Sequence, residues 1–257
     1  MSLSAPKFLL LKSTQRSSTS SSATDCELRL AEALHNVSAV NLRRFSCPNT
    51  IYNIQTGIND VVCLTRSSTD YTVTIDAGSY TANALATAIQ AEMNDADSNS
   101  YTCTYDSKTM KFTITGSAAF TLTWATHTSA STGMYKVLGW TAADTSSATS
   151  QTATVVANLS SPTSMLMRIT EFGSCGVCGN LPYTFDLPLN VASGMLTYIA
   201  SSTNYPQRLS FGQAGRSFQN LHVRLFDDEN TEIELNGAEW ELLLEIEYLP
   251  LDRKLTL

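Results

Sequence analysis

The residues with the clearest potential for chemistry are two cysteines three positions apart. Cys175-Gly176-Val177-Cys178 has the CxxC spacing found in zinc sites and in thiol–disulfide enzymes. A structural zinc site needs four ligands, usually two such pairs, and the sequence has no second pair. A thioredoxin-like redox centre expects a strand–helix–strand context, which this segment lacks. We therefore interpret the motif as a Gly-rich loop with two free thiols, with zinc binding as the less favoured alternative.

Other residue types that support catalysis or metal binding are dispersed. The sequence has three histidines, far apart in the chain: His35, His127 and His222. No G-x-S-x-G elbow, phosphate loop or dinucleotide fingerprint occurs. Acidic residues cluster at 227–234, but their spacing does not match an EF-hand, so we interpret them as a solvated turn. Paired carboxylates for glycoside chemistry stay open, because their separation is spatial. The sequence predicts no catalytic residue, no metal, no cofactor and no enzyme.

Composition narrows the class of protein. The chain has 257 residues, 16 Lys+Arg against 23 Asp+Glu and a net charge of −7, which argues against a dedicated nucleic-acid binder. Charged residues are only 15% and hydrophobic residues 43%, so we expect a folded chain with a real core. No apolar run approaches the length of a transmembrane segment. We find no signal peptide, and therefore expect synthesis in the cytosol and six free cysteines.

Residues 1–24 predict a flexible, basic N-terminal arm. They contain Lys7, Lys12 and Arg16 but no acidic residue, and they end in a Ser/Thr-rich tract. One apolar tetrad interrupts them: Phe8, Leu9, Leu10 and Leu11. Two interpretations stay open: a simple mobile terminus, or an arm that docks this tetrad in a groove of a neighbouring molecule.

The body of the chain, residues 25–75 and 151–257, shows the period-2 alternation of half-buried strands. Residues 71–75 and 221–225 each place three apolar side chains on one face. Asn236-Gly237 is a strong tight-turn dipeptide before the long alternating run at 240–248. The length of the body fits a single eight-stranded antiparallel jelly roll. We therefore expect the chain to be all-β apart from its insertion.

Residues 76–150 predict a small α+β insertion of the order βαβββ. Thr81 can cap a helix that runs to about Met93, on which apolar residues recur every four positions. Three short strands are expected at 101–105, 111–115 and 120–124, with a break at Gly116-Ser117. A helical turn should end at Gly139.

Three stretches resemble penton proteins, the vertex minor capsid proteins of icosahedral double-stranded DNA viruses with double-jelly-roll major capsids. Such viruses include virophages, polinton-like viruses and nucleocytoplasmic large DNA viruses. The first stretch is P-N-T-I-Y-N-I at 48–54 with I-N-D at 58–60. The second is Y-T-V-T-I-D-A-G-S-Y-T at 71–81 with the L-G-W at 138–140. The third and most specific is L-H-V-R-L-F-D-D at 221–228 with L-N-G-A-E-W-E-L at 235–242.

The resemblance implies a structural capsid protein. Five copies would form a homopentamer that closes a five-fold vertex of the virion, in contact with the surrounding major capsid protein. The N-terminal arm would reach an internal minor capsid protein or a neighbouring subunit. We expect the strongly acidic final hairpin to be exposed rather than placed at a subunit contact.

Two alternatives remain. One is a receptor- or glycan-binding spike or lectin-like jelly roll whose insertion carries a pocket, and its only aromatic candidates there are Trp124, Tyr135 and Trp140. A small core is the favoured interpretation of these three residues. The other is an enzyme on a jelly-roll scaffold, which three dispersed histidines disfavour.

Overall fold

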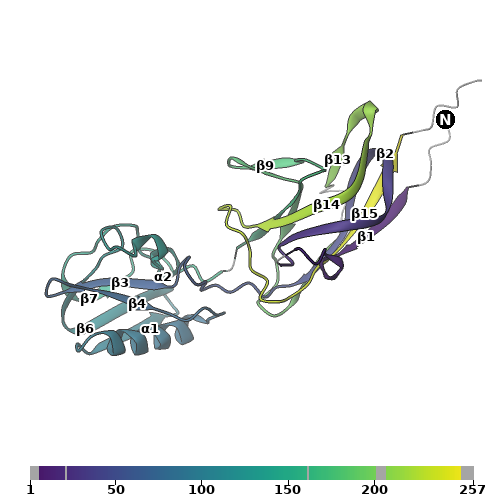
Figure 1. Ribbon diagram of the computed structural model, residues 1–257. Helices are drawn as coiled ribbons and strands as arrows, with labels where there is room; N and C mark the ends of the chain where they lie inside the picture. The colour runs from purple at the N-terminus through teal and green to yellow at the C-terminus, as the bar shows by residue number, and fades with distance from the viewer. Residues whose placement is uncertain (1–5, 21, 161, 201–206, 250–257) are drawn as a thin grey trace, which may run out of the picture. The chain divides into compact units, whose positions relative to one another are not determined.

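The chain forms two compact units. The computed structural model describes residues 6–20, 22–160, 162–200 and 207–249. The first unit combines Met1–Ile51 with Pro162–Leu257, and the second is Tyr52–Ser161. Strands from both ends of the chain, purple and yellow in Figure 1, therefore lie in the same unit.

The first unit is built from antiparallel strands. In its described residues one sheet has the order β1-β15-β2-β14-β8-β11, with β12 and β13 also paired to β2, and β9 and β10 form a separate hairpin. In chain order the strands are β1 (Lys7–Lys12), β2 (Asp25–Pro48), β8 (Ser164–Ile169), β9 (Gly176–Cys178), β10 (Leu181–Tyr183), β11 (Phe185–Pro188), β12 (Leu196–Ala200), β13 (Arg208–Ser210), β14 (Arg216–Phe226) and β15 (Glu241–Tyr248). Two 3-10 turns, η1 (Ser13–Gln15) and η3 (Gly212–Ala214), complete it.

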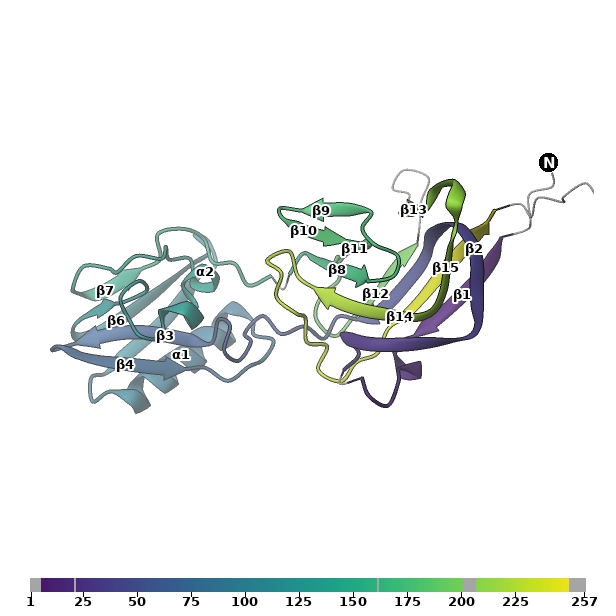
Figure 2. The same ribbon diagram turned by 45° about the horizontal axis from the view of Figure 1, so that its top comes forward.

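One strand, β2, connects the two halves of this unit. Its first part pairs with β14, from Asp25 to Val37, and its second part pairs with β15 on one edge and with β12 and β13 on the other. Asn36, at φ 55°, and the register shifts nearby let the strand bend where it changes partners. β2 and β14 curve together in Figure 2. This curled antiparallel arrangement confirms the predicted jelly-roll fold.

The jelly-roll core is apolar, and a buried polar side chain, that of Gln207, lies beside one of its strands. Trp240, Phe45 and Phe185 are among its largest fully buried members. The Gln207 side-chain amide accepts from the N–H of Asp186 in β11 and donates to the main-chain carbonyl of the same residue. The main-chain carbonyl of Gln207 accepts from Leu42 N–H in β2 at 2.9 Å. Among the described strands β11 and β2 are not paired, and Gln207 links them.

The second unit is an α+β fold with its own core. Its sheet has the order β4-β3-β6-β5, and β7 also pairs with β6. The cluster around Trp124, Phe112 and Ile89 fills the space between helix and sheet. The elements are β3 (Val61–Arg66), β4 (Thr69–Thr74), α1 (Ala82–Ala96), β5 (Tyr101–Asp106), β6 (Lys111–Leu122), η2 (Ala130–Thr132), α2 (Tyr135–Leu138) and β7 (Ala148–Thr152).

Local signals placed the helices correctly. The hydroxyl of Thr81 accepts from Ala84 N–H at 3.3 Å and caps α1, whose buried face contains Leu85, Ile89 and Met93. Helix α2 ends at Gly139, which has φ 89°. A Cβ at Gly139 would lie 2.4 Å from the carbonyl oxygen of Val155, so only glycine fits there.

The structure differs from the sequence prediction in three places. The second unit is larger than the insertion expected at 76–150, because β3 and β4 join its sheet. β2 is one strand from Asp25 to Pro48, although in the sequence only the short runs 27–30 and 40–43 alternate clearly. β6 continues through Gly116, where a break was expected. The glycine serves close packing instead of a turn, since a Cβ would lie 2.7 Å from the Asn99 side chain.

Candidate assembly interface

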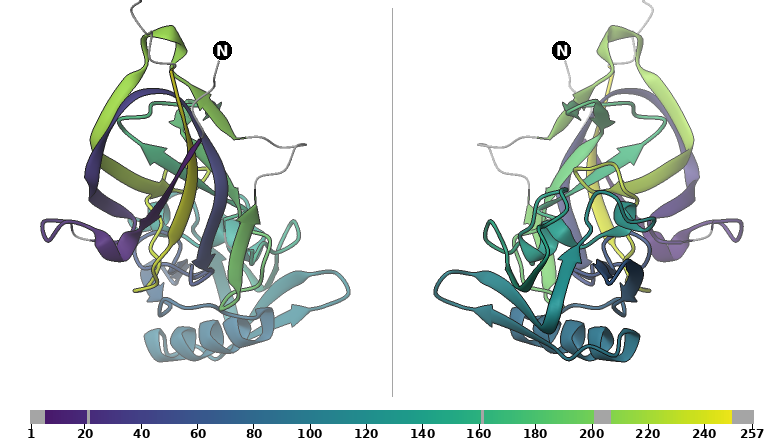
Figure 3. Two further views of the ribbon diagram at one scale, coloured as in Figure 1. Left: turned by 90° about the vertical axis from the view of Figure 1, so that its right-hand side faces the viewer. Right: turned by 90° about the vertical axis from the view of Figure 1, so that its left-hand side faces the viewer.

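The N-terminal segment forms the edge of the jelly-roll sheet. β1 pairs antiparallel with β15, with Leu10 opposite Leu243 and Leu11 opposite Leu242. β1, β15 and β2 run side by side in the left view of Figure 3. The expectation of a flexible arm is therefore wrong for Lys7–Lys12, because the backbone of these residues bonds to β15. Residues 1–5 and 21 lie outside the described residues.

The apolar tetrad of this strand divides between two faces. Leu11 is buried in the core at 4% exposure, and Leu9 packs against that core. Phe8 and Leu10 alternate with them and are 59% and 42% exposed. Two of the four residues therefore stabilise the chain itself, and only Phe8 and Leu10 remain available for a partner.

The segment after β1 is tied to the loop before β15. Ser13 Oγ accepts from Trp240 N–H at 2.8 Å, and Arg16 pairs with Glu239 at 2.7 Å. The Trp240 indole N–H donates to the carbonyl of Ala23 at 2.6 Å. Burial alone would raise the pKa of Glu239, but hydrogen bonds from Ser13 and Arg16 hold it below its ordinary value. Ser13, Arg16 and Ala23 are thus fixed against Glu239 and Trp240, just before β15.

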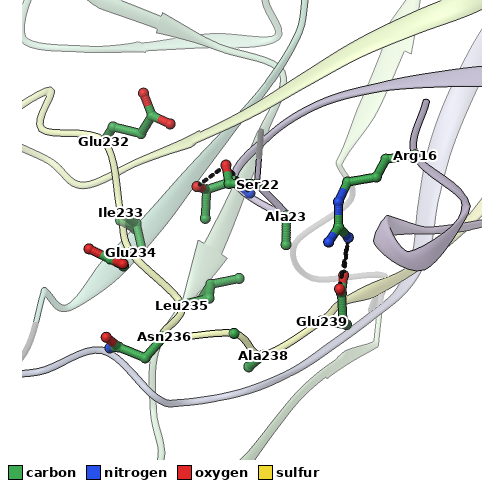
Figure 4. A pocket seen from close by; sticks show the side chains of 12 residues that line it. Arg16, Ser22, Ala23, Glu232, Ile233, Glu234, Leu235, Asn236, Ala238 and Glu239 are labelled. Atoms are coloured by element: carbon green, nitrogen blue, oxygen red, sulfur yellow. Dashed lines mark hydrogen bonds and ion pairs between the residues drawn. The ribbon is translucent and has the colours of Figure 1, made fainter. Parts of the chain in front are cut away.

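A cleft of about 560 Å³ opens beside these contacts. Figure 4 shows the Arg16–Glu239 pair at one end and the loop with Glu232 and Glu234 along the other side. Asn236 and Gly237, at φ 48° and 83°, form the turn that shapes the loop, and Ala238 N–H donates to Leu235 at 2.9 Å. The Asn236 side chain donates to the Thr50 carbonyl at 2.8 Å.

Ion pairs cover the middle of the sheet's outer face. In β15, Glu241 pairs with Lys12 at 2.6 Å and with Arg44 at 3.6 Å. The next two outward carboxylates of β15 also have partners: Glu245 pairs with Arg43, and Glu247 with Arg208 at 2.9 Å.

These ion pairs lower the pKa values of two β15 glutamates, Glu241 and Glu247. The hydrogen bond from Lys12 lowers the pKa of Glu241, and those from Arg208 and Asn41 lower that of Glu247. The acidic final strand is therefore compensated by cations from β1, β2 and β13.

The opposite edge of the sheet is apolar and was not identified from the sequence. Leu196 and Tyr198 of β12 are 58% and 57% exposed, and Met195 before them is 60% exposed. Thr197 is fully buried, and Ile199 packs against the core. In the sequence, residues 196–200 are only a short strand candidate, and nothing there indicates that the exposed face of this strand is the apolar one.

The two CxxC cysteines lie on the β9–β10 hairpin. Cys175 is exposed and Cys178 half-buried, and both are free thiols. The other four cysteines are buried, and burial raises the pKa of Cys47 and of Cys103 to about 12. Among the described residues, no group of three His, Cys, Asp or Glu side chains is arranged to hold a metal ion.

The histidines have separate environments. His35 contacts Ser217 at 3.2 Å, and the ring of His127 accepts from Ser129 N–H at 3.1 Å. His222 contacts Asp25 at 2.6 Å.

Within the described ranges, no helix is long and apolar enough to cross a membrane.

The aromatic residues of the second unit belong to its core. Trp124 and Trp140 are 1% and 4% exposed, with ring centroids 6.1 Å apart, and Tyr135 packs beside them. These are the residues on which a glycan-binding insertion would have depended.

Comparison with known proteins finds similarity to solved structures. No protein-family model matches the chain, and no curated protein matches it. A solved structure with a similar arrangement is the crystal structure of selenomethionine-labelled mavirus penton protein, with a TM-score of 0.49 and 10% sequence identity. The match covers 96% of this chain and 100% of that chain. That protein is a penton, the kind of protein that the three sequence motifs resemble.

Proposed function

We propose that the chain is a structural protein of a viral capsid, a penton subunit whose homopentamer closes the five-fold vertices of an icosahedral shell. The observation that carries this proposal is the third penton-like motif and its place in the fold. Residues 221–226 form the second half of β14, and residues 235–242 form the Asn236-Gly237 turn and the start of β15. The most specific motif is therefore the framework on which the N-terminal segment and β2 assemble.

The surface chemistry supports a role in assembly. The jelly roll exposes apolar side chains at both edges of one sheet, while the charges between them are paired. The alternative of a glycan-binding spike has lost its candidate residues, because Trp124 and Trp140 are buried. The partners we propose are further copies of this chain, the major capsid protein around the vertex and an internal minor capsid protein at the N-terminal segment. The location we propose is the virion.

The mass of the purified protein in solution tests this function. Native mass spectrometry and light scattering should give an assembly five times the 27.9 kDa of the chain. Co-expression with the major capsid protein should place the assembly at the vertices of particles seen by electron cryomicroscopy. A stable trimer, or a monomer that particles never incorporate, contradicts the proposal and favours a spike.

A further inference from the structure

The outer face of one jelly-roll sheet is apolar at both ends. Leu9 and Leu11 of β1 face the core, so Phe8 and Leu10 face outward. On β12, Thr197 is buried and Ile199 packs on the core, so the exposed Leu196 and Tyr198 also face outward.

The pairing registers place both pairs on the same side of the sheet. One row runs from Lys12 through Glu241 and Ser46 to Tyr198. Because β1 and β12 are at opposite edges, with β15 and β2 between them, these two apolar patches cannot cover each other within one chain.

The centre of this face can be buried without leaving a charge unpaired. Each outward carboxylate of β15 has a cation on a neighbouring strand: Glu241 with Lys12, Glu245 with Arg43 and Glu247 with Arg208. An unpaired buried charge is strongly destabilising, whereas a compensated pair at an interface is tolerated. The acidity of the last strand, which led us to expect exposure, is therefore no obstacle to a subunit contact here.

Strand direction permits the two edges to meet in successive copies. Each neighbouring pair in the row β1, β15, β2, β12 is antiparallel, so β1 and β12 run in opposite directions. A rotation about an axis along the strands preserves strand direction, and brings β1 of one copy antiparallel to β12 of the next. Antiparallel strand pairs outnumber parallel ones in proteins, so this arrangement is a favourable one for two edge strands.

We propose that neighbouring copies meet head to tail through this sheet, with Phe8 and Leu10 of one copy packed against Leu196 and Tyr198 of the next. A head-to-tail contact uses a different patch on each partner, and repeating it with rotation closes a ring in which every patch is covered. The inference rests on the proposed homopentamer and identifies the surfaces that build it.

Single charged substitutions at each edge test the contact. Leu10→Asp and Tyr198→Asp place a carboxylate in opposite halves of the proposed interface. Both positions are exposed in the single chain, so circular dichroism should show an unchanged fold. We expect each variant to raise the dissociation constant of the ring about tenfold or more. Val177→Asp is the matched control: Val177 is 62% exposed on the β9–β10 hairpin, away from both edges, and its variant should assemble normally.

Cross-linking then distinguishes a head-to-tail contact from a two-fold one. In a background with Cys175→Ser and Cys178→Ser, the full chain carries Leu10→Cys, Tyr198→Cys or both, and is treated with a short bis-maleimide. The double variant should give covalent oligomers up to five chains, while each single variant stays monomeric on a denaturing gel. A dimer from Leu10→Cys alone reveals a two-fold β1–β1 contact and overturns the proposal.

The failures of the two proposals are distinguishable. A wild-type pentamer that forms equally well with Leu10→Asp and Tyr198→Asp overturns the head-to-tail contact and leaves the penton function standing. A wild-type chain that forms no ring overturns the function, and the contact with it.

Discussion

Trp240 donates a 2.6 Å hydrogen bond from its indole nitrogen to the carbonyl of Ala23, 217 positions earlier in the chain. This bond joins the loop before the last strand to the segment before the longest one. Both partners are buried, so neither can exchange the bond for one to water.

We predict that Trp240→Phe destabilises the first unit by about 1–3 kcal/mol, because the Ala23 carbonyl loses its buried donor. The control is Trp124→Phe in the second unit. Among the described residues the indole N–H of Trp124 has no hydrogen-bond partner, so its removal costs only packing. Urea unfolding followed by circular dichroism measures both, and a larger loss for Trp124→Phe contradicts the assignment.

Because adjacent leucines of β1 lie on opposite faces of the strand, we expect their substitution to change the free energy of unfolding by unequal amounts. Leu11→Ser removes a buried side chain from the core and should lower the free energy of unfolding by about 2–4 kcal/mol. Leu10→Ser, at a 42% exposed position, should change it by less than about 0.5 kcal/mol. Equal effects of the two substitutions in chemical denaturation would show that β1 is not docked as described.

An acidic residue of the second unit predicts a pH-dependent stability. Arg66 donates to both carboxylate oxygens of Asp97, and Tyr101 donates to one of them at 2.8 Å. The hydrogen bond from Arg66 is the largest of the effects that hold the pKa of Asp97 well below its ordinary value of 3.8. Since the folded pKa is lowered, this stabilisation is present above pH 3.8 and is lost as the pH falls further.

We therefore expect Asp97→Asn to lower the melting temperature of the second unit by about 5–10 °C at pH 7. The difference from wild type should shrink below pH 3.8, where the unfolded wild-type carboxyl becomes protonated. Asp95→Asn, at an exposed position near the end of α1, serves as the control and should have little effect at either pH. A constant difference across the pH range in differential scanning calorimetry contradicts the role given to Asp97.

The unit boundaries predict which deletion folds. Joining Ile51 to Pro162 through a Gly/Ser linker removes the whole second unit, and should leave a soluble β-protein that unfolds cooperatively. Joining Ile75 to Val155 retains β3 and β4 without β6, their partner in the sheet. We expect that protein to aggregate, because the buried faces of Val62 and Leu64 lose their cover. Size-exclusion chromatography and circular dichroism compare the two.

The features that could be predicted from the sequence depend on neighbours in the chain. Thr81 caps a helix through a bond to Ala84, and the amphipathic spacing of Leu85, Ile89 and Met93 lies within a few turns. The Asn236-Gly237 dipeptide adopts positive φ angles for reasons internal to the two residues. Such signals act locally, and they correctly placed α1 and the last strand.

The features that could not be predicted depend on distant partners. In the sequence, Phe8–Leu11 is an apolar segment of a tail, and its place in the sheet depends on hydrogen bonds to β15, more than 230 positions later. Alternation at 71–75 shows a half-buried strand, but not which of two cores covers it. The apolar edge at Leu196 and Tyr198 is recognised only when Thr197 and Ile199 are seen to face inward.

The long strand β2 has a consequence for the order in which the chain acquires structure during synthesis. A ribosome delivers β2 early, yet its partners β12, β14 and β15 start only at Leu196, Arg216 and Glu241. The second unit emerges whole in this interval, and its contacts are closer in sequence, so it can fold first. Until the last strand leaves the ribosome, the 24 residues of β2 lack the partner of one edge, and an unpaired edge of this length favours aggregation.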